Sequence, residues 1–111
     1  PGGTETVLVV DDDPMLRGAL VRLMGRWGYT ILAADNAGAA LKAASYHRGA
    51  IDLLLTDIIM PGLSGVELAR ELSEDRPEMK VIYLTASGEI EDSDVPPGQI
   101  LLHKPLSLIH I

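Results

Sequence analysis

Short apolar runs recur along the chain and are separated by longer segments in which apolar residues are spaced differently. The first run, "TVLVV" at 6–10, consists of β-branched and apolar residues without polar alternation. This composition is typical of a strand that is buried on both faces of a parallel sheet. Further runs predict strands at 29–34, 51–57, 80–86 and 99–104.

The segment 14–27 has the spacing of an amphipathic helix. Its large apolar residues recur three or four positions apart, which places them on one helical face. Asp13 is a suitable N-cap in front of the proline that opens the segment, and Gly28 is a suitable stop. We therefore predict a helix here, with Trp27 in the core.

Two further segments predict helices. Residues 36–47 are rich in alanine, the strongest helix former, with Asn36 or Asp35 as the N-cap. Residues 64–75 begin with Ser64 and carry a glutamate three positions later, which is the arrangement of a capping box.

The alternation of strands and helices predicts an α/β fold with a parallel sheet and right-handed crossovers. The segment 87–98 is acidic and contains two prolines, so we expect a fourth helix there to be short or broken. A fifth helix after Pro105 is also expected to be short, because few residues remain. We assign residues 1–5 to a linker and residues 6–111 to one domain.

Composition and charge narrow the class of protein. A chain of 111 residues, 47% of them hydrophobic, fits one globular domain. It has no cysteine for a disulfide or a thiolate metal site, and no apolar run long enough to span a bilayer. The net charge of −7 disfavours nucleic-acid binding, which requires a basic surface. We expect a cytoplasmic domain that itself contacts neither nucleic acid nor membrane.

Polar residues end four of the predicted strands. Since sites in open parallel sheets form beyond the carboxyl ends of the strands, these residues should meet at one edge. They are Asp11, Asp12, Asp57, Thr85 and Lys104.

The chemistry of this set predicts a site that handles phosphoryl groups. Three carboxylates at one edge repel one another unless a cation lies among them, and oxygen ligands suit Mg²⁺ or Mn²⁺. Lys104 can neutralise a further negative charge, and Thr85 offers a hydroxyl group. Asp57 can then act as a nucleophile and form an aspartyl phosphate.

Four segments together resemble the receiver (response-regulator) domain family of two-component signalling. They are "VLVVDDDP", "LLLTDIIMPGLSGVEL", "VIYLTAS" and "LLHKP", in the order of the family, and the resemblance runs from about Thr6 to Pro105. It implies a flavodoxin-like, doubly wound, five-stranded parallel sheet in the order 2-1-3-4-5, an order for which a receiver is a standard example.

The resemblance also implies a role for each residue of the edge. Asp57 is then the phosphoacceptor, Lys104 pairs with the phosphoryl oxygen and Thr85 is the switch hydroxyl. The Mg²⁺ ligands are then Asp11, Asp12, Asp57 and the backbone carbonyl of Ile59. The implied partner is a sensor histidine kinase or a histidine phosphotransfer protein.

The chain departs from the family pattern at position 101, where Leu101 replaces the usual aromatic residue. The phrases around Asp57 and Lys104 resemble the receivers of hybrid sensor histidine kinases, so we expect the cytoplasmic part of such a kinase. No independent enzyme is expected beyond Mg²⁺-dependent self-phosphorylation and slow self-dephosphorylation. The alternative is an interaction module that is not phosphorylated. A phosphatase is disfavoured because Ile59 occupies the position of its acid/base carboxylate.

Overall fold

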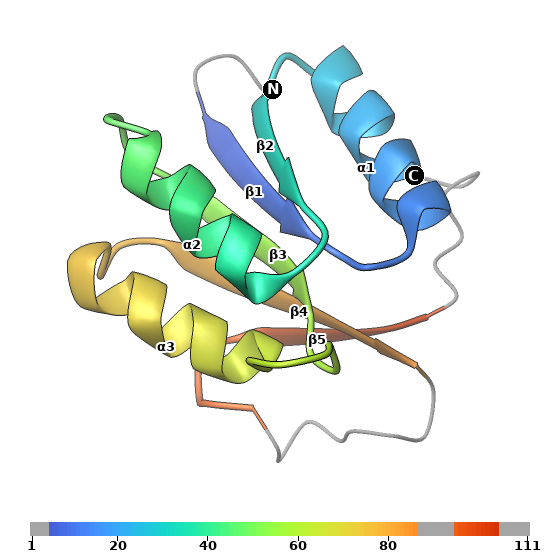
Figure 1. The fold of residues 1–111 in the computed structure, drawn as a ribbon. Coiled ribbons are helices and arrows are strands. Elements are labelled where there is room, and N and C mark those ends of the chain that lie inside the picture. The colour runs from blue at the N-terminus through green and yellow to red at the C-terminus, as the bar shows by residue number, and fades with distance from the viewer. Residues whose placement is uncertain (1–4, 87–94, 105–111) are drawn as a thin grey trace.

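A computed structural model describes residues 5–86 and 95–104. All strands pair in parallel, in the order β2-β1-β3-β4-β5, as predicted (Figure 1). The predicted linker and the predicted fourth and fifth helices lie wholly or largely outside the described residues. The elements are β1 (Thr6–Val10), α1 (Pro14–Arg26), β2 (Thr30–Ala34), α2 (Ala37–Tyr46), β3 (Leu53–Asp57), α3 (Gly65–Asp75), β4 (Lys80–Ala86) and β5 (Ile100–Lys104).

The sheet separates two apolar cores. Val7 and Val9 pack with Leu20 of α1, whereas Leu8 and Val10 face the core formed with α2 and α3. Successive side chains of a strand point to opposite faces, so an unbroken apolar run supplies both cores at once. This burial confirms the prediction of a strand covered on both faces.

The predicted N-caps are all present. Asp13 Oδ1 accepts a hydrogen bond from the Met15 backbone N–H at 3.0 Å, and Asn36 is the cap of α2. Ser64 and Glu67 form a complete capping box, with bonds of 3.2 and 3.1 Å. These bonds satisfy backbone donors that a helix cannot satisfy itself, so they define where each helix begins.

The predicted burial of Trp27 is wrong. Its side chain is 42% exposed, and the residue is the C-cap of α1. Gly28 follows with φ of +89°, a left-handed conformation that ends the helix as expected. In the sequence, Trp27 continues the apolar spacing of α1. In the structure it lies at the C-cap, after the last helical residue, so its side chain is not held on the buried face of the helix.

Arg76, directly after α3, holds the end of α2. Its guanidinium donates hydrogen bonds to the backbone carbonyls of Ala44 at 3.1 Å, His47 at 3.0 Å and Gly49 at 2.8 Å. Carbonyls at a helix C-terminus have no partner within the helix and carry partial negative charge, so a cation is favoured there. This residue joins two helices that are distant in sequence.

The Arg76→Ala substitution is expected to lower the free energy of unfolding by about 2 kcal/mol, because it removes charged donors from these carbonyls. Urea denaturation followed by circular dichroism measures the change. The control is Arg22→Ala, on the exposed surface of α1, which should change stability by less than about 0.5 kcal/mol. Equal losses in the two variants would contradict the assignment.

Candidate functional site

The pairing register of β1 with β3 places Asp11 beside Asp57 at the carboxyl ends of these strands. Val10 pairs with Thr56, so the residues that follow them, Asp11 and Asp57, lie next to each other at the carboxyl edge. Asp12 follows in the loop that leads into α1. The geometry therefore comes from the pairing of β1 with β3.

The three carboxylates form one cluster. Ligand oxygens of Asp11, Asp12 and Asp57 all lie within 4.8 Å of one another. Asp11 is 0% exposed and Asp57 is 6% exposed, whereas Asp12 is exposed. The cluster is thus backed by the protein on one side and open to solvent on the other.

Asp11 is fixed by hydrogen bonds from the segment that follows it. Its Oδ1 accepts from the Asp13 backbone N–H at 2.8 Å. Its backbone carbonyl accepts from the Arg17 guanidinium, one turn into α1, at 2.7 Å. Arg17 was not identified from the sequence, because an arginine at a helix start has many possible partners and no local pattern selects this one.

The backbone of Asp57 packs directly against the start of α3. The Gly65 N–H donates to the Ile58 carbonyl at 2.8 Å, and the Thr56 hydroxyl donates to the Asp57 carbonyl at 2.9 Å. A Cβ atom at Gly65 would lie 2.1 Å from the Asp57 carbonyl oxygen, which is sterically impossible without movement. Gly65 is therefore required for this approach.

The other predicted site residues lie along the same edge. Leu84 pairs with Asp57, and Thr85, the next residue, is 1% exposed. Ile59 lies two residues beyond Asp57 with its side chain 51% exposed. Lys104 ends β5 opposite Ala86, and its side chain lies outside the described part of the chain. The roles of these residues stay predictions.

The donor set of the cluster fits a hard divalent cation. Carboxylate oxygens are the ligands that Mg²⁺ and Mn²⁺ prefer, and both ions commonly retain several waters. Asp12 is exposed, so the cluster is open to solvent on that side. A cation would also offset the repulsion between carboxylates so close together.

Position 101 is apolar and packed. Leu101 is half-buried against the core on the α2 and α3 side, and it pairs with Tyr83 on β4. The Tyr83 hydroxyl donates to Gln99 Oε1 at 2.5 Å, just before β5. Burial raises the pKa of Tyr83, while the charge of Arg70 lowers that pKa by less. Tyr83, two positions before Thr85 on β4, thus has its hydroxyl held by a hydrogen bond.

A model of the response regulator receiver domain family matches residues 7–95 of this chain. The matched residues include Asp11, Asp12, Asp57 and Thr85 and end before Lys104. Response regulator receiver protein CpdR of Brucella abortus (strain 2308) is 34% identical over 105 residues, which span 92% of this chain and 86% of that protein.

A second relative is much longer. Sensor kinase CckA of Brucella abortus (strain 2308) is 35% identical over 91 residues, which span 82% of this chain and only 9% of that kinase. This chain therefore corresponds to a small part of the kinase.

Two solved structures contain the response regulator protein TrrA. TrrA of Thermotoga maritima in complex with Mg²⁺-BeF superposes with a TM-score of 0.74 and 32% identity, over 96% of this chain and 91% of that one. The complex of TrrA with histidine kinase ThkA gives a TM-score of 0.69 and 34% identity, over 90% of this chain and 85% of that one.

Within residues 5–86 and 95–104, none of the helices has the length and apolar character that crossing a membrane requires.

Proposed function

Because this chain belongs to the response regulator receiver domain family, we propose that Asp57 accepts a phosphoryl group from a phosphohistidine, with Mg²⁺ held beside it. The observation that carries the proposal is the carboxylate cluster. It places a nearly buried Asp57 within 4.8 Å of Asp11 and Asp12 at the ligand atoms. Receiver domains bind Mg²⁺ at such a cluster of aspartates.

The proposed step is an in-line transfer. A carboxylate oxygen of Asp57 forms a bond to phosphorus while the P–N bond of the phosphohistidine breaks, and the imidazole nitrogen keeps the electron pair. The ion would be held by Asp11, Asp12, Asp57 and the Ile59 carbonyl, and when bound it would offset charge on the phosphoryl oxygens. We assign Lys104 to a phosphoryl oxygen and Thr85 to the switch hydroxyl. The product is an aspartyl phosphate.

The proposed phosphodonor is a sensor histidine kinase or a histidine phosphotransfer protein. Support comes from TrrA, which was crystallised with histidine kinase ThkA, and from the match to part of sensor kinase CckA. We propose that residues 6–111 form the receiver of a cytoplasmic hybrid kinase region. The domain itself would contact neither nucleic acid nor membrane.

Incubation with acetyl phosphate and Mg²⁺ is expected to add the mass of one phosphoryl group per chain, measured by intact-mass spectrometry. Removal of divalent ions with EDTA should slow the gain by about tenfold or more, because the transferring charge is then poorly stabilised. Absence of any mass gain would overturn the acceptor role. A gain that is insensitive to EDTA would overturn the role of the metal.

A further inference from the structure

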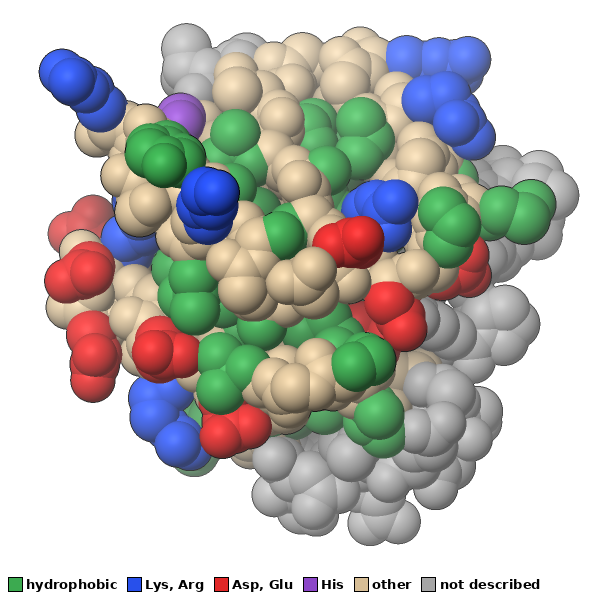
Figure 2. Space-filling view, in the orientation of Figure 1, with side chains coloured by type: hydrophobic (Ala, Val, Ile, Leu, Met, Phe, Trp, Pro, Cys, Tyr) green, Lys and Arg blue, Asp and Glu red, His purple; other side chains and the backbone are tan. Residues whose placement is uncertain are grey.

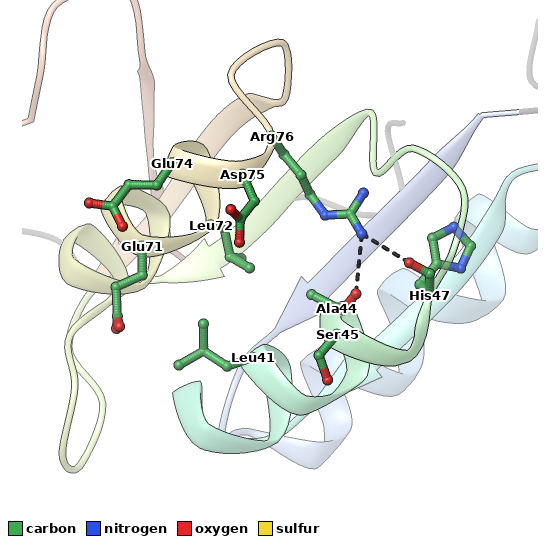
Figure 3. A pocket seen from close by; sticks show the side chains of 9 residues that line it. All are labelled: Leu41, Ala44, Ser45, His47, Glu71, Leu72, Glu74, Asp75 and Arg76. Carbon is green, nitrogen blue, oxygen red and sulfur yellow. Dashed lines mark hydrogen bonds between the residues drawn. The ribbon is translucent and has the colours of Figure 1, made fainter.

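A groove lies between the C-terminal halves of α2 and α3. Its volume is about 660 Å³, within the range of pockets that bind ligands. Its apolar lining residues are Leu41, which is half-buried, and Ala44 and Leu72, which are buried. Figure 3 shows Leu41 on α2 and Leu72 on α3 at the space between the two helices.

The groove is held in shape by Arg76 at one end. The bonds from Arg76 to the Ala44 and His47 carbonyls cross from the end of α3 to the end of α2 (Figure 3). A third bond holds the Gly49 carbonyl. Because these contacts set the spacing of the helix ends, a ligand would not need to open the groove.

The rim on the α3 side is acidic. Glu71, Glu74 and Asp75 line the groove there, and all three are exposed. A neighbouring hollow of about 370 Å³ shares Asp75 and Arg76 with the groove and adds Asp52 and Glu78. Figure 2 shows carboxylates gathered over this end of α3 beside apolar side chains.

Three carboxylates and one cation are among the residues that line the groove. Among the described lining residues, Arg76 is the only Lys or Arg, and its guanidinium bonds three backbone carbonyls. Three exposed carboxylates, those of Glu71, Glu74 and Asp75, therefore line the groove beside Leu41 and Leu72. Such a surface is complementary to a cationic ligand that also carries apolar groups.

The groove lies at the opposite end of the fold from Asp57. In a parallel α/β unit the helices run back against the strands, so the C-terminal ends of α2 and α3 lie at the amino edge of the sheet (Figure 1). The carboxylate cluster lies at the carboxyl edge. An occupant of the groove would leave the phosphoacceptor accessible.

We propose that this groove docks a basic segment of a partner protein. The segment would insert apolar side chains against Leu41 and Leu72 and set Lys or Arg against Glu71, Glu74 and Asp75. Helices that lay an apolar face into a groove are a common form of peptide recognition, and charge complementarity here selects a basic one. This surface is separate from the proposed phosphotransfer.

Titration of the ¹⁵N-labelled protein with a short synthetic amphipathic helix made of Leu, Lys and Arg tests the proposal. Amide shifts should concentrate at Leu41, Ala44 and Leu72. A peptide of equal charge with Ser in place of Leu should bind with an affinity at least about tenfold lower, because its apolar contact is lost. The Asp57→Asn variant should bind like the unmodified protein.

Charge reversal provides the matched comparison. Glu74→Lys should lower the affinity for the Leu-containing peptide about fivefold. Glu5 is exposed and lies outside the groove, so Glu5→Lys should change that affinity less than about twofold. Equal effects of the two variants, or equal binding of the two peptides, would show only attraction to an acidic protein and would overturn the proposal. Amide shifts confined to the Asp57 edge would also overturn the proposal. So would displacement of the Leu-containing peptide by spermine at the concentration at which the unlabelled peptide displaces it.

Discussion

The Asp57→Asn substitution is expected to abolish phosphorylation by acetyl phosphate, with the rate reduced by at least about a thousandfold. The amide is isosteric with the carboxylate but is not a nucleophile for phosphorus. It also removes one of the three charges that would hold the metal, so the affinity for Mg²⁺ should fall about tenfold or more. Intact-mass spectrometry measures the first effect and calorimetric titration with Mg²⁺ the second.

The matched control for this substitution is Asp75→Asn. Asp75 is exposed at the end of α3, outside the carboxylate cluster, so the same chemical change there should leave both measurements unaltered. A phosphoryl adduct that persists in Asp57→Asn would assign the acceptor role to another residue, and peptide mapping would then test Asp11 and Asp12. Loss of the adduct in both variants would show that general acidity, and not this site, controls the reaction.

The sheet and the cluster were predictable because each depends on local composition combined with one general rule. Apolar runs placed the strands, and helix-capping residues such as Ser64 placed the starts of the helices. The rule that parallel strands meet at one edge then brought Asp11 to Asp57 across 46 positions of sequence. No specific long-range contact had to be known for either step.

Contacts that depend on individual side chains were not predictable. Arg76 bonds carbonyls 27 to 32 positions away, and no sequence pattern distinguishes it from an exposed arginine. Trp27 continued the helical spacing but lies where the helix has already ended. Whether a side chain at a helix end is buried depends on the direction in which the chain leaves the helix. The spacing of apolar residues does not predict that direction.

Position 101 shows a different limit. The sequence shows the absence of an aromatic residue there, but only the structure shows that Leu101 packs on the core beside Tyr83. The Tyr83 hydroxyl is held by Gln99, and Tyr83 lies two positions before Thr85 on the same strand, β4. The sequence indicates only that position 101 has lost its aromatic side chain. The structure shows that Leu101 pairs with Tyr83, 18 positions earlier in the chain.

The Gly65→Ala substitution is expected to destabilise the protein by about 3 kcal/mol and to slow phosphorylation of Asp57. The new methyl group would lie 2.1 Å from the Asp57 carbonyl oxygen and 3.0 Å from Ile58 Cα. All of the closest atoms belong to the backbone, so no side chain can rotate away and either α3 or the Asp57 backbone must move. Urea denaturation and the rate of adduct formation measure the two effects.

Gly25→Ala is the matched control, with the opposite sign. Gly25 lies in α1, and a Cβ atom there would meet nothing within 4 Å. Alanine should therefore stabilise the protein by about 0.5 to 1 kcal/mol through helix propensity, without changing phosphorylation. If Gly65→Ala lowers stability but leaves the rate per folded molecule unchanged, the tight approach of α3 serves the fold alone. A slower rate under conditions where the variant is fully folded would show that the first residue of α3 positions the acceptor.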